Sequence, residues 1–303
     1  MNTATTLRTV LGHYPHTAAL HSGELIDPAV HLDFQNVGVV HKAFAPMVRD
    51  QAYDLCELAV VTALQAIAYD RPVVLLPAVI ASRFQRGCLI GYGPNGVPAE
   101  PDLVGKRIGV RAYTQTTGMW VRAHLAEDFG LDITKVQWIT HDPAHVEQYQ
   151  NPRFVEQIPG TKGTLQMLRD GDVDAAILGN DLPTGEEYIS VIKNAGERDL
   201  AWWHKHRFMP INHLVVASAD ACARQPDAIR HAFALLREAD RRITSAVSEA
   251  GTSCWPTMFG FVSLAGALDF TIDACMAQGL LPRRLSLEEV FAPARKLLGS
   301  DAD

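Results

Sequence analysis

The stretch Arg107-Ile108-Gly109-Val110-Arg111-Ala112-Tyr113-Thr114-Gln115-Thr116-Thr117-Gly118 is the clearest fold signal in the chain. Its first four residues predict a strand, residues 113–118 a turn, and the residues that follow a helix from about Met119 to Asp128 that ends at Gly130. A strand that turns into a helix in this way is the repeating unit of a parallel α/β sheet.

The same alternation continues on both sides of this stretch. Helices are predicted at residues 39–51, 62–68 and 164–168, and strands at residues 7–11, 52–58, 73–77, 88–92, 136–140, 174–178 and 210–217. From residue 219 to residue 300 the chain is predicted to be helical, with breaks at Pro226, Gly251 and Pro256. Because the strands are almost continuous apolar runs, we expect sheets with helices on both faces.

The length and one breaker-rich segment predict two lobes. The 303 residues exceed the usual size of one domain, and residues 93–101 are rich in proline and glycine. We expect residues 1–93 and 209–303 to form one α/β lobe and residues 94–208 to form a second, inserted one. Two such lobes, with mixed or parallel sheets and two crossing strands, resemble the type II periplasmic-binding-protein fold, whose ligand lies in the cleft between the lobes.

Composition and charge exclude several classes of function. The 34 acidic and 27 basic side chains give a formal charge of −7, so no basic field would attract nucleic acid. The N-terminus lacks the features of a secretory signal, and no apolar run approaches the ~20 residues that span a bilayer. We therefore expect a cytoplasmic protein that does not bind membranes. The five cysteines include no Cys-x-x-Cys pair, which indicates neither a disulfide framework nor a thiolate zinc site.

Polar side chains gather in the first lobe where strands are predicted to end. His13, Tyr14 and His16 follow the first strand. The two imidazoles could exchange protons with a substrate, although an exposed loop with incidental histidines is the alternative. Glu57 precedes an apolar stretch, so it is either a partly buried carboxylate with a raised pKa or a charge at a helix N-terminus.

Two polar pairs occupy strand positions elsewhere. Asn212 and His213 interrupt an apolar strand, which makes them either satisfied core groups or site residues. Asn180 and Asp181 end another strand, at the position where α/β sheets bind ligands.

The second lobe carries a candidate carboxylate site at the turn into its first helix. Gln115, Thr116 and Thr117 would place hydroxyls and backbone N–H groups at the positive end of the helix dipole, although an ordinary helix cap would look the same. Arg111 precedes this turn and Arg83 follows another predicted strand, so each could bind a carboxylate, with solvated surface arginines as the alternative.

Sequence similarity extends these observations. The chain resembles the 4,5-dihydroxyphthalate decarboxylases of bacterial phthalate degradation along stretches that run in order through most of its length. These stretches are residues 12–20, 43–47, 105–118, 142–149, 179–181, 210–216, 278–284 and 288–291. The resemblance implies a carboxy-lyase that acts on a small aromatic dicarboxylate and yields protocatechuate and CO₂.

The implied reaction needs acid–base groups and carboxylate binding. Each carboxylated ring carbon lies para to a hydroxyl, so loss of the phenolic proton favours protonation of that carbon and release of CO₂ without an electron-sink cofactor. Catalytic roles are predicted for His16, His213 and Glu57. Substrate-binding roles are predicted for His13, Tyr14, Arg83, Arg111, Gln115, Thr116, Thr117, Asn180, Asp181 and Asn212.

Three alternatives remain open at this stage. A divalent metal held by His13, His16, His145 and Glu147 could chelate the catechol oxygens. A non-enzymatic binding protein for a small aromatic carboxylate would use the same cleft. A decarboxylase could also act on another hydroxylated aromatic dicarboxylate. We expect a homo-oligomer in each case.

Overall fold

The computed structural model describes residues 4–160, 162–248 and 255–302 and divides the chain into two compact units. Unit 1 comprises the chain up to Ser82, Ile211–Ile272 and the chain from Arg283; unit 2 comprises Arg83–Pro210 and Asp273–Pro282. The expected boundary at residue 93 comes too late, because the strand of residues 89–92 pairs inside unit 2. The sequence also did not predict that Asp273–Pro282 belongs to unit 2.

Unit 1 is an α/β unit built on one six-stranded sheet. Its strands are β1 (Thr5–Val10), β2 (Val30–Phe34), β3 (Leu55–Ala59), β4 (Val73–Ser82), β11 (Ile211–Ser218) and β12 (Met258–Phe259). Its helices are α1 (Ala18–His21), α2 (Phe44–Asp50), α3 (Val60–Ala68), α7 (Ala219–Arg224), α8 (Pro226–Ser248), α10 (Leu287–Leu298) and most of α9 (Phe261–Ala277), whose last residues belong to unit 2.

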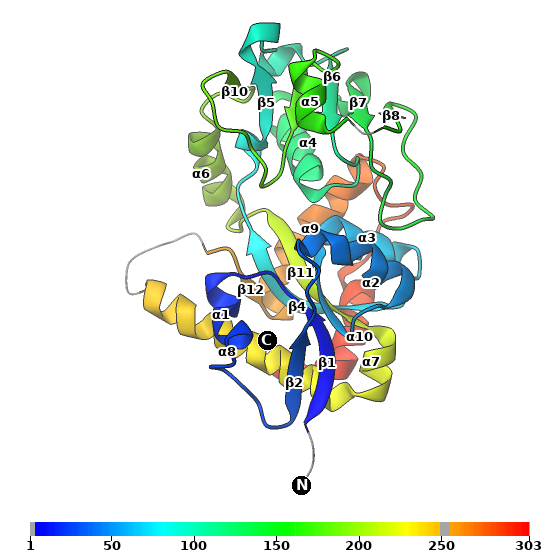
Figure 1. Cartoon of the computed structure of the whole chain (residues 1–303), viewed down its shortest axis with the longest axis vertical. Coiled ribbons are helices and arrows are strands. Elements are labelled where there is room, and N and C mark those ends of the chain that lie inside the picture. Colours follow the sequence, from blue (N-terminus) through cyan, green and yellow to red (C-terminus); the bar gives the residue numbers. More distant parts are fainter. Residues whose placement is uncertain (1–3, 161, 249–254, 303) are drawn as a thin grey trace. The chain divides into compact units, whose positions relative to one another are not determined.

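The sheet of unit 1 is mixed. Its strand order is β12-β4-β11-β3-β1-β2, and β1 lies parallel to β2 and β3. Figure 1 shows β1 and β2 side by side. The returning strand β11 runs antiparallel to β3 and β4. We expected β4 to stop at Pro77, but it continues to Ser82, because the register between β4 and β11 shifts near Pro77 and accommodates a residue that cannot donate to the ladder.

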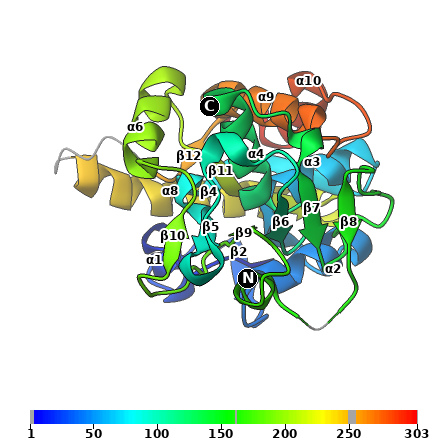
Figure 2. The same cartoon turned by 90° about the horizontal axis from the view of Figure 1, so that it is seen from above.

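Unit 2 contains a second mixed sheet. Its strands are β5 (Leu89–Tyr92), β6 (Arg107–Val110), β7 (Gln137–Thr140), β8 (Val155–Gln157), β9 (Ala175–Ile177) and β10 (Tyr188–Ser190), and its helices are α4 (Thr116–Phe129), α5 (Thr164–Arg169) and α6 (Ala195–His206). The order is β10-β5-β9-β6-β7-β8, and Figure 2 shows β6, β7 and β8 side by side. Strands β6, β7, β8 and β9 run parallel to one another, β5 runs antiparallel to β9, and β10 runs antiparallel to β5.

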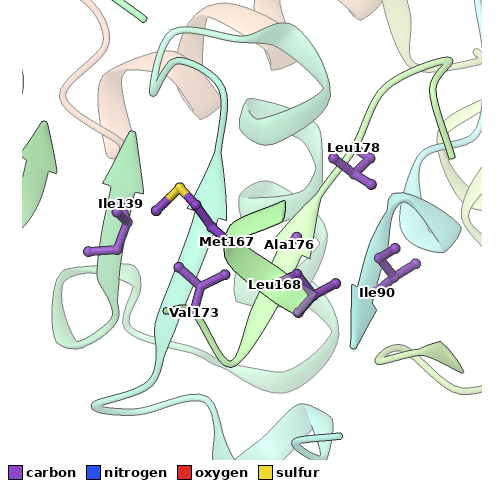
Figure 3. Packing of buried hydrophobic residues seen from close by; sticks show 7 residues of the cluster. All are labelled: Ile90, Ile139, Met167, Leu168, Val173, Ala176 and Leu178. Carbon is purple, nitrogen blue, oxygen red and sulfur yellow. The ribbon is translucent and has the colours of Figure 1, made fainter. Parts of the chain in front are cut away.

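A hydrophobic core joins α5 to the sheet of unit 2. Met167 and Leu168 of α5 pack with side chains from β5, β7 and β9 and the segments beside them (Figure 3). The other members of this cluster are Ile90, Ile139, Val173, Ala176 and Leu178. Burying Met167 and Leu168 contributes about 1.5–3 kcal/mol each, which fixes α5 on the strands.

The α/β class with two mixed sheets covered by helices confirms the predicted fold class. Several local predictions need correction. The helix expected at residues 39–51 is a 3-10 turn, Val40–Ala43, followed by the shorter α2, which Gln51 ends in a left-handed conformation. Helix α4 begins at Thr116, three residues earlier than expected, and ends as predicted before Gly130. The predicted break at Gly251 lies outside the described residues.

Among the helices in the described ranges, none is long and apolar enough to cross a membrane. The four cysteines that the structure describes are free thiols, and Cys254 lies outside those residues.

Candidate active site

A loop after β1 brings a tyrosine and a glycine N–H to a buried carboxylate of unit 1. The loop is held by Thr17, whose hydroxyl accepts from the Tyr14 backbone N–H at 2.9 Å and donates to the Gly12 carbonyl at 2.7 Å. Pro15 begins the short 3-10 turn Pro15–Thr17, where its missing N–H costs nothing. These contacts fix the Tyr14 side chain beside Glu57, the middle residue of β3.

Glu57 is the centre of this arrangement. Its side chain is fully buried, and its carboxylate accepts three hydrogen bonds: from the Gly12 N–H at 2.6 Å, the Tyr14 hydroxyl at 2.6 Å and Nδ1 of His213 at 2.5 Å. Burial would raise the pKa of Glu57, but the bonds and charge of these donors outweigh it and hold the pKa below its ordinary value. One of the two interpretations of the sequence was a raised pKa, and the three donors explain why the pKa is lowered instead.

The register of the sheet brings these residues together. In the antiparallel pair β3 and β11, Glu57 faces Val215 and Ala59 faces His213, so Glu57 and His213 are diagonal neighbours. Strand β1 pairs in parallel with β3 through Val10 and Cys56, which places Gly12 just beyond the end of β1 near Glu57.

His213 has one ring nitrogen committed and one available for chemistry. Because Nδ1 is bonded to Glu57, we assign it the proton, and Nε2 is then the nitrogen that can exchange protons. The side chain is 19% exposed and contacts Phe44 edge to face, with ring centroids 5.2 Å apart. The pair therefore has the geometry of a carboxylate-oriented acid–base histidine.

Glu57 itself cannot contact a substrate in this arrangement. A catalytic role was predicted for Glu57, but its exposure is 0% and its oxygens already serve three donors. The geometry makes it a positioning residue. The Tyr14 hydroxyl, predicted to bind substrate, is likewise bonded to Glu57, and burial together with the charge of Glu57 raises its pKa above the ordinary range.

The two other predicted histidines of this loop differ in environment. His16 is buried, its Nε2 lies 2.8 Å from the Ile80 carbonyl and its ring stacks on Tyr14. Because a carbonyl can only accept, Nε2 carries the proton, and burial lowers the pKa of this imidazole. His13 is exposed and stacks on His21 with centroids 3.8 Å apart.

Unit 2 gathers a separate set of polar groups at the start of α4. Arg83 donates to the Gly179 carbonyl at 3.3 Å and to the Thr117 hydroxyl at 3.2 Å. The Gly179 N–H donates to Asp181 at 2.9 Å, and a Cβ at Gly179 would meet Gln115 Nε2 at 3.4 Å. These contacts bring five predicted positions of unit 2 close together: Arg83, Gln115, Thr116, Thr117 and Asp181.

This second group has unused hydrogen-bonding capacity. Three buried atoms find no hydrogen-bond partner within the described part of the chain: Arg83 Nε, Gln115 Oε1 and Thr116 Oγ1. The first N–H groups of α4 also have no partner inside the helix. A guanidinium beside a helix N-terminus is suited to binding a carboxylate.

The remaining predicted residues are placed less centrally. Arg111 forms an ion pair with Asp142, with Nε 3.6 Å from Oδ2, so a substrate carboxylate would compete with Asp142 for it. Asn180 is exposed, and Asn212 is buried beside His213 in β11. Among the described residues, no group of three or more His, Cys, Asp or Glu side chains could hold a metal ion, so His13, His16, His145 and Glu147 are not assembled into a ligand set.

Sequence reasoning missed the role of Gly12, whose N–H reaches Glu57. The only signal in the sequence was a glycine directly after the predicted strand and two residues before Tyr14. Such a glycine indicates that another group packs closely against it, but the sequence does not show which group.

Comparisons with known proteins agree with this architecture. No protein-family model matches the chain. The chain is 26% identical over 326 residues to a 4,5-dihydroxyphthalate decarboxylase of Comamonas testosteroni, covering 95% of this chain and 96% of that protein. It is 30% identical over 183 residues to a 4,5-dihydroxyphthalate decarboxylase of Pseudomonas putida, covering 56% of this chain and 69% of that protein.

Solved structures show the same fold at low identity. The periplasmic aliphatic sulphonate binding protein of Escherichia coli has a TM-score of 0.61 at 12% identity, covering 95% of this chain and 92% of that one. The alkanesulfonate-binding protein of Xanthomonas axonopodis pv. citri, bound to MOPS, has a TM-score of 0.57 at 14% identity, covering 96% and 99%. The fold is thus that of periplasmic solute-binding proteins. By sequence, the chain belongs to the 4,5-dihydroxyphthalate decarboxylase family, a family of carboxy-lyases.

Proposed function

We propose that this chain decarboxylates 4,5-dihydroxyphthalate to protocatechuate and CO₂, as a step of phthalate degradation. Family membership supports the substrate. The observation that carries the chemistry is the 2.5 Å contact between Glu57 and Nδ1 of His213, which leaves Nε2 to move protons. Metal assistance is a separate question that the experiment below answers.

The reaction balances with one proton and no redox change. Loss of the phenolic proton para to one carboxylate raises electron density on the ring carbon that bears it. That carbon takes a proton and becomes tetrahedral, and the bond to the carboxylate breaks. The electron pair returns to the ring, CO₂ leaves, and the phenolate oxygen takes back the proton that it lost. Overall, the substrate dianion and one proton give the protocatechuate monoanion and CO₂.

His213 is the proposed acid that protonates the ring carbon. Its Nε2 would donate the proton, while Glu57 at Nδ1 keeps the ring in one orientation and stabilises the imidazolium before transfer. A carboxylate with no exposed surface is a fixed partner, because it cannot rotate towards water.

His16 is the proposed acceptor of the phenolic proton. The Ile80 carbonyl holds the proton on Nε2, so Nδ1 bears the lone pair. Burial lowers the pKa of His16, which keeps the imidazole neutral near pH 7 and able to accept a proton.

Carboxylate binding is assigned to the polar group of unit 2. Arg83 supplies the charge, and Thr116, Thr117 and the first N–H groups of α4 supply further donors. The unpartnered Nε of Arg83 supports this assignment, since a buried N–H without an acceptor is costly until an anion arrives.

A second candidate function is ligand binding without turnover. It is favoured by the structural similarity to sulphonate-binding proteins and by the same polar group of unit 2. The two candidates differ in whether product forms.

The test uses purified, chelator-treated protein incubated with 4,5-dihydroxyphthalate, with and without added divalent metal. Chromatography follows protocatechuate, and gas analysis follows CO₂. In D₂O the product should carry one deuterium at the carbon that lost its carboxylate. His213→Gln and His16→Ala are compared with His231→Gln, a matched control because His231 also contacts a carboxylate, Asp27, through Nδ1 in unit 1.

We expect turnover without metal, its loss in His213→Gln, its reduction in His16→Ala and no change in His231→Gln. Turnover only with metal would replace the proposed acid–base scheme with metal-assisted catalysis. Full activity of His16→Ala would remove His16 from the mechanism. Binding of 4,5-dihydroxyphthalate without product in either condition would support the ligand-binding function.

A further inference from the structure

Gly12 leaves room for the ring of Tyr14. A Cβ on residue 12 would lie 2.7 Å from both Cε2 and Cζ of Tyr14 and 2.8 Å from its hydroxyl oxygen. Such distances are far below van der Waals contact, so the ring would have to move. The φ of Gly12 lies outside the left-handed region, which means that this position needs space and not an unusual backbone.

The Tyr14 ring has little freedom to move without breaking its contacts. Its hydroxyl donates to Oε1 of Glu57 at 2.6 Å, and its face stacks on His16 with centroids 5.2 Å apart and planes inclined by 8°. Its backbone N–H is held by the Thr17 hydroxyl at 2.9 Å. Displacing the ring would therefore remove a donor from Glu57.

Gly12 and Tyr14 act on the same carboxylate as His213. The Gly12 N–H occupies Oε2, while Tyr14 and His213 share Oε1. Each donor restricts rotation of the carboxylate, and together they define the plane in which Oε1 meets the imidazole. Neither Gly12 nor Tyr14 needs to touch a substrate to have this effect.

We infer that Gly12 and Tyr14 form a positioning pair that holds Glu57 in the orientation required by His213. Gly12 contributes one N–H and the space for the ring; Tyr14 contributes the hydroxyl and covers the carboxylate. The catalytic consequence rests on the proposed function, whereas the geometric claim does not.

The kinetic test is a double-mutant cycle of Gly12→Ala, Tyr14→Ala and the double variant. Gly12→Ala should lower kcat by about 100-fold, the cost typical of a small misplacement of catalytic groups, with KM changed by less than about threefold. Tyr14→Phe, which keeps the ring and loses one hydrogen bond to a charged group, should lower kcat by about tenfold. In the Tyr14→Ala background, Gly12→Ala should cost little more, because no ring remains for the Cβ to displace.

A substrate-free measurement accompanies the kinetics. The His213 Nδ1 proton in its short bond to Glu57 should give a strongly downfield proton resonance, identified by its absence in Glu57→Gln. The resonance should shift or vanish in Gly12→Ala and Tyr14→Phe. Gly266→Ala is the matched control, since Gly266 lies in α9 of unit 1 and an added methyl group there would meet nothing within 4 Å outside its own helix turn.

The inference is overturned if Gly12→Ala costs as much in the Tyr14→Ala background as in the wild type, or if Gly12→Ala and Tyr14→Phe leave the resonance unmoved. If Gly12→Ala does not fold, Tyr14→Phe decides by the resonance alone. Absence of decarboxylation by the wild type would refute the proposed function, and the resonance would still test the positioning pair.

Discussion

Replacing Glu57 by glutamine tests the central interaction of the proposed mechanism. The amide has the same shape, but it carries no charge and turns one acceptor into a donor, so three donors face one good acceptor. At an effective dielectric constant of about 20, unit charges about 4 Å apart attract by about 4 kcal/mol. Losing that attraction to the His213 imidazolium corresponds to about a 1,000-fold lower rate of protonation.

The assay is the rate of protocatechuate formation at saturating substrate near neutral pH. The pKa of Glu57 lies below its ordinary value, so the wild-type carboxylate is charged throughout this range. We expect kcat of Glu57→Gln to fall about 1,000-fold, with KM nearly unchanged, because Glu57 does not reach the substrate.

Asp54→Asn is the control for Glu57→Gln. Asp54 is a buried carboxylate of the same unit, three residues earlier, that accepts from the backbone N–H and guanidinium of Arg8. Its replacement should lower stability and leave kcat nearly unchanged. If Glu57→Gln keeps more than about a tenth of wild-type kcat, the charge of Glu57 lowers the activation free energy by less than about 1.4 kcal/mol. That result would refute the proposed electrostatic role of Glu57.

Three further predictions concern the stability of unit 2, measured by denaturant unfolding. Burial lowers the pKa of His124 from 6.5 to about 3, so the unfolded chain accepts a proton that the folded state resists, and stability falls as the pH drops below 6.5. His124→Phe should remove about 2 kcal/mol of this loss by about pH 5. An unchanged dependence of stability on pH would contradict this prediction. Burial would raise the pKa of Glu127, but three donors of α6 hold it at about 2. The contribution of Glu127 to the free energy of unfolding should therefore disappear as the pH falls from 4.5 towards 2. Glu127→Gln should lower stability by about 1–2 kcal/mol at pH 7. The buried guanidinium of Arg86 forms ion pairs with Asp128 and Asp199. Arg86→Leu should lower the free energy of unfolding by about 3–5 kcal/mol, because it leaves both carboxylates unpaired. A loss below about 1 kcal/mol would show that water solvates the two carboxylates in the folded state.

Local sequence patterns predicted the elements whose signals are local. The strand Arg107–Val110 has its expected bounds, and the helix beginning at Thr164 ends one residue later than expected. Gly130 ends α4 because a left-handed residue at that position suits glycine. Strands β2, β8 and β10 were not predicted, since they are short and expose several side chains at or near sheet edges, where the apolar pattern is weak.

The sequence alone determined the α/β class and the presence of proton-transferring and anion-binding residue types after the strands. It placed Glu57, His213 and Tyr14 among the candidates but assigned Glu57 a direct role. Tertiary structure decided their partners: Glu57 and His213 are 156 positions apart and meet through the register of β3 and β11. A side chain's neighbours across a sheet depend on register and burial, which no local pattern of residues specifies.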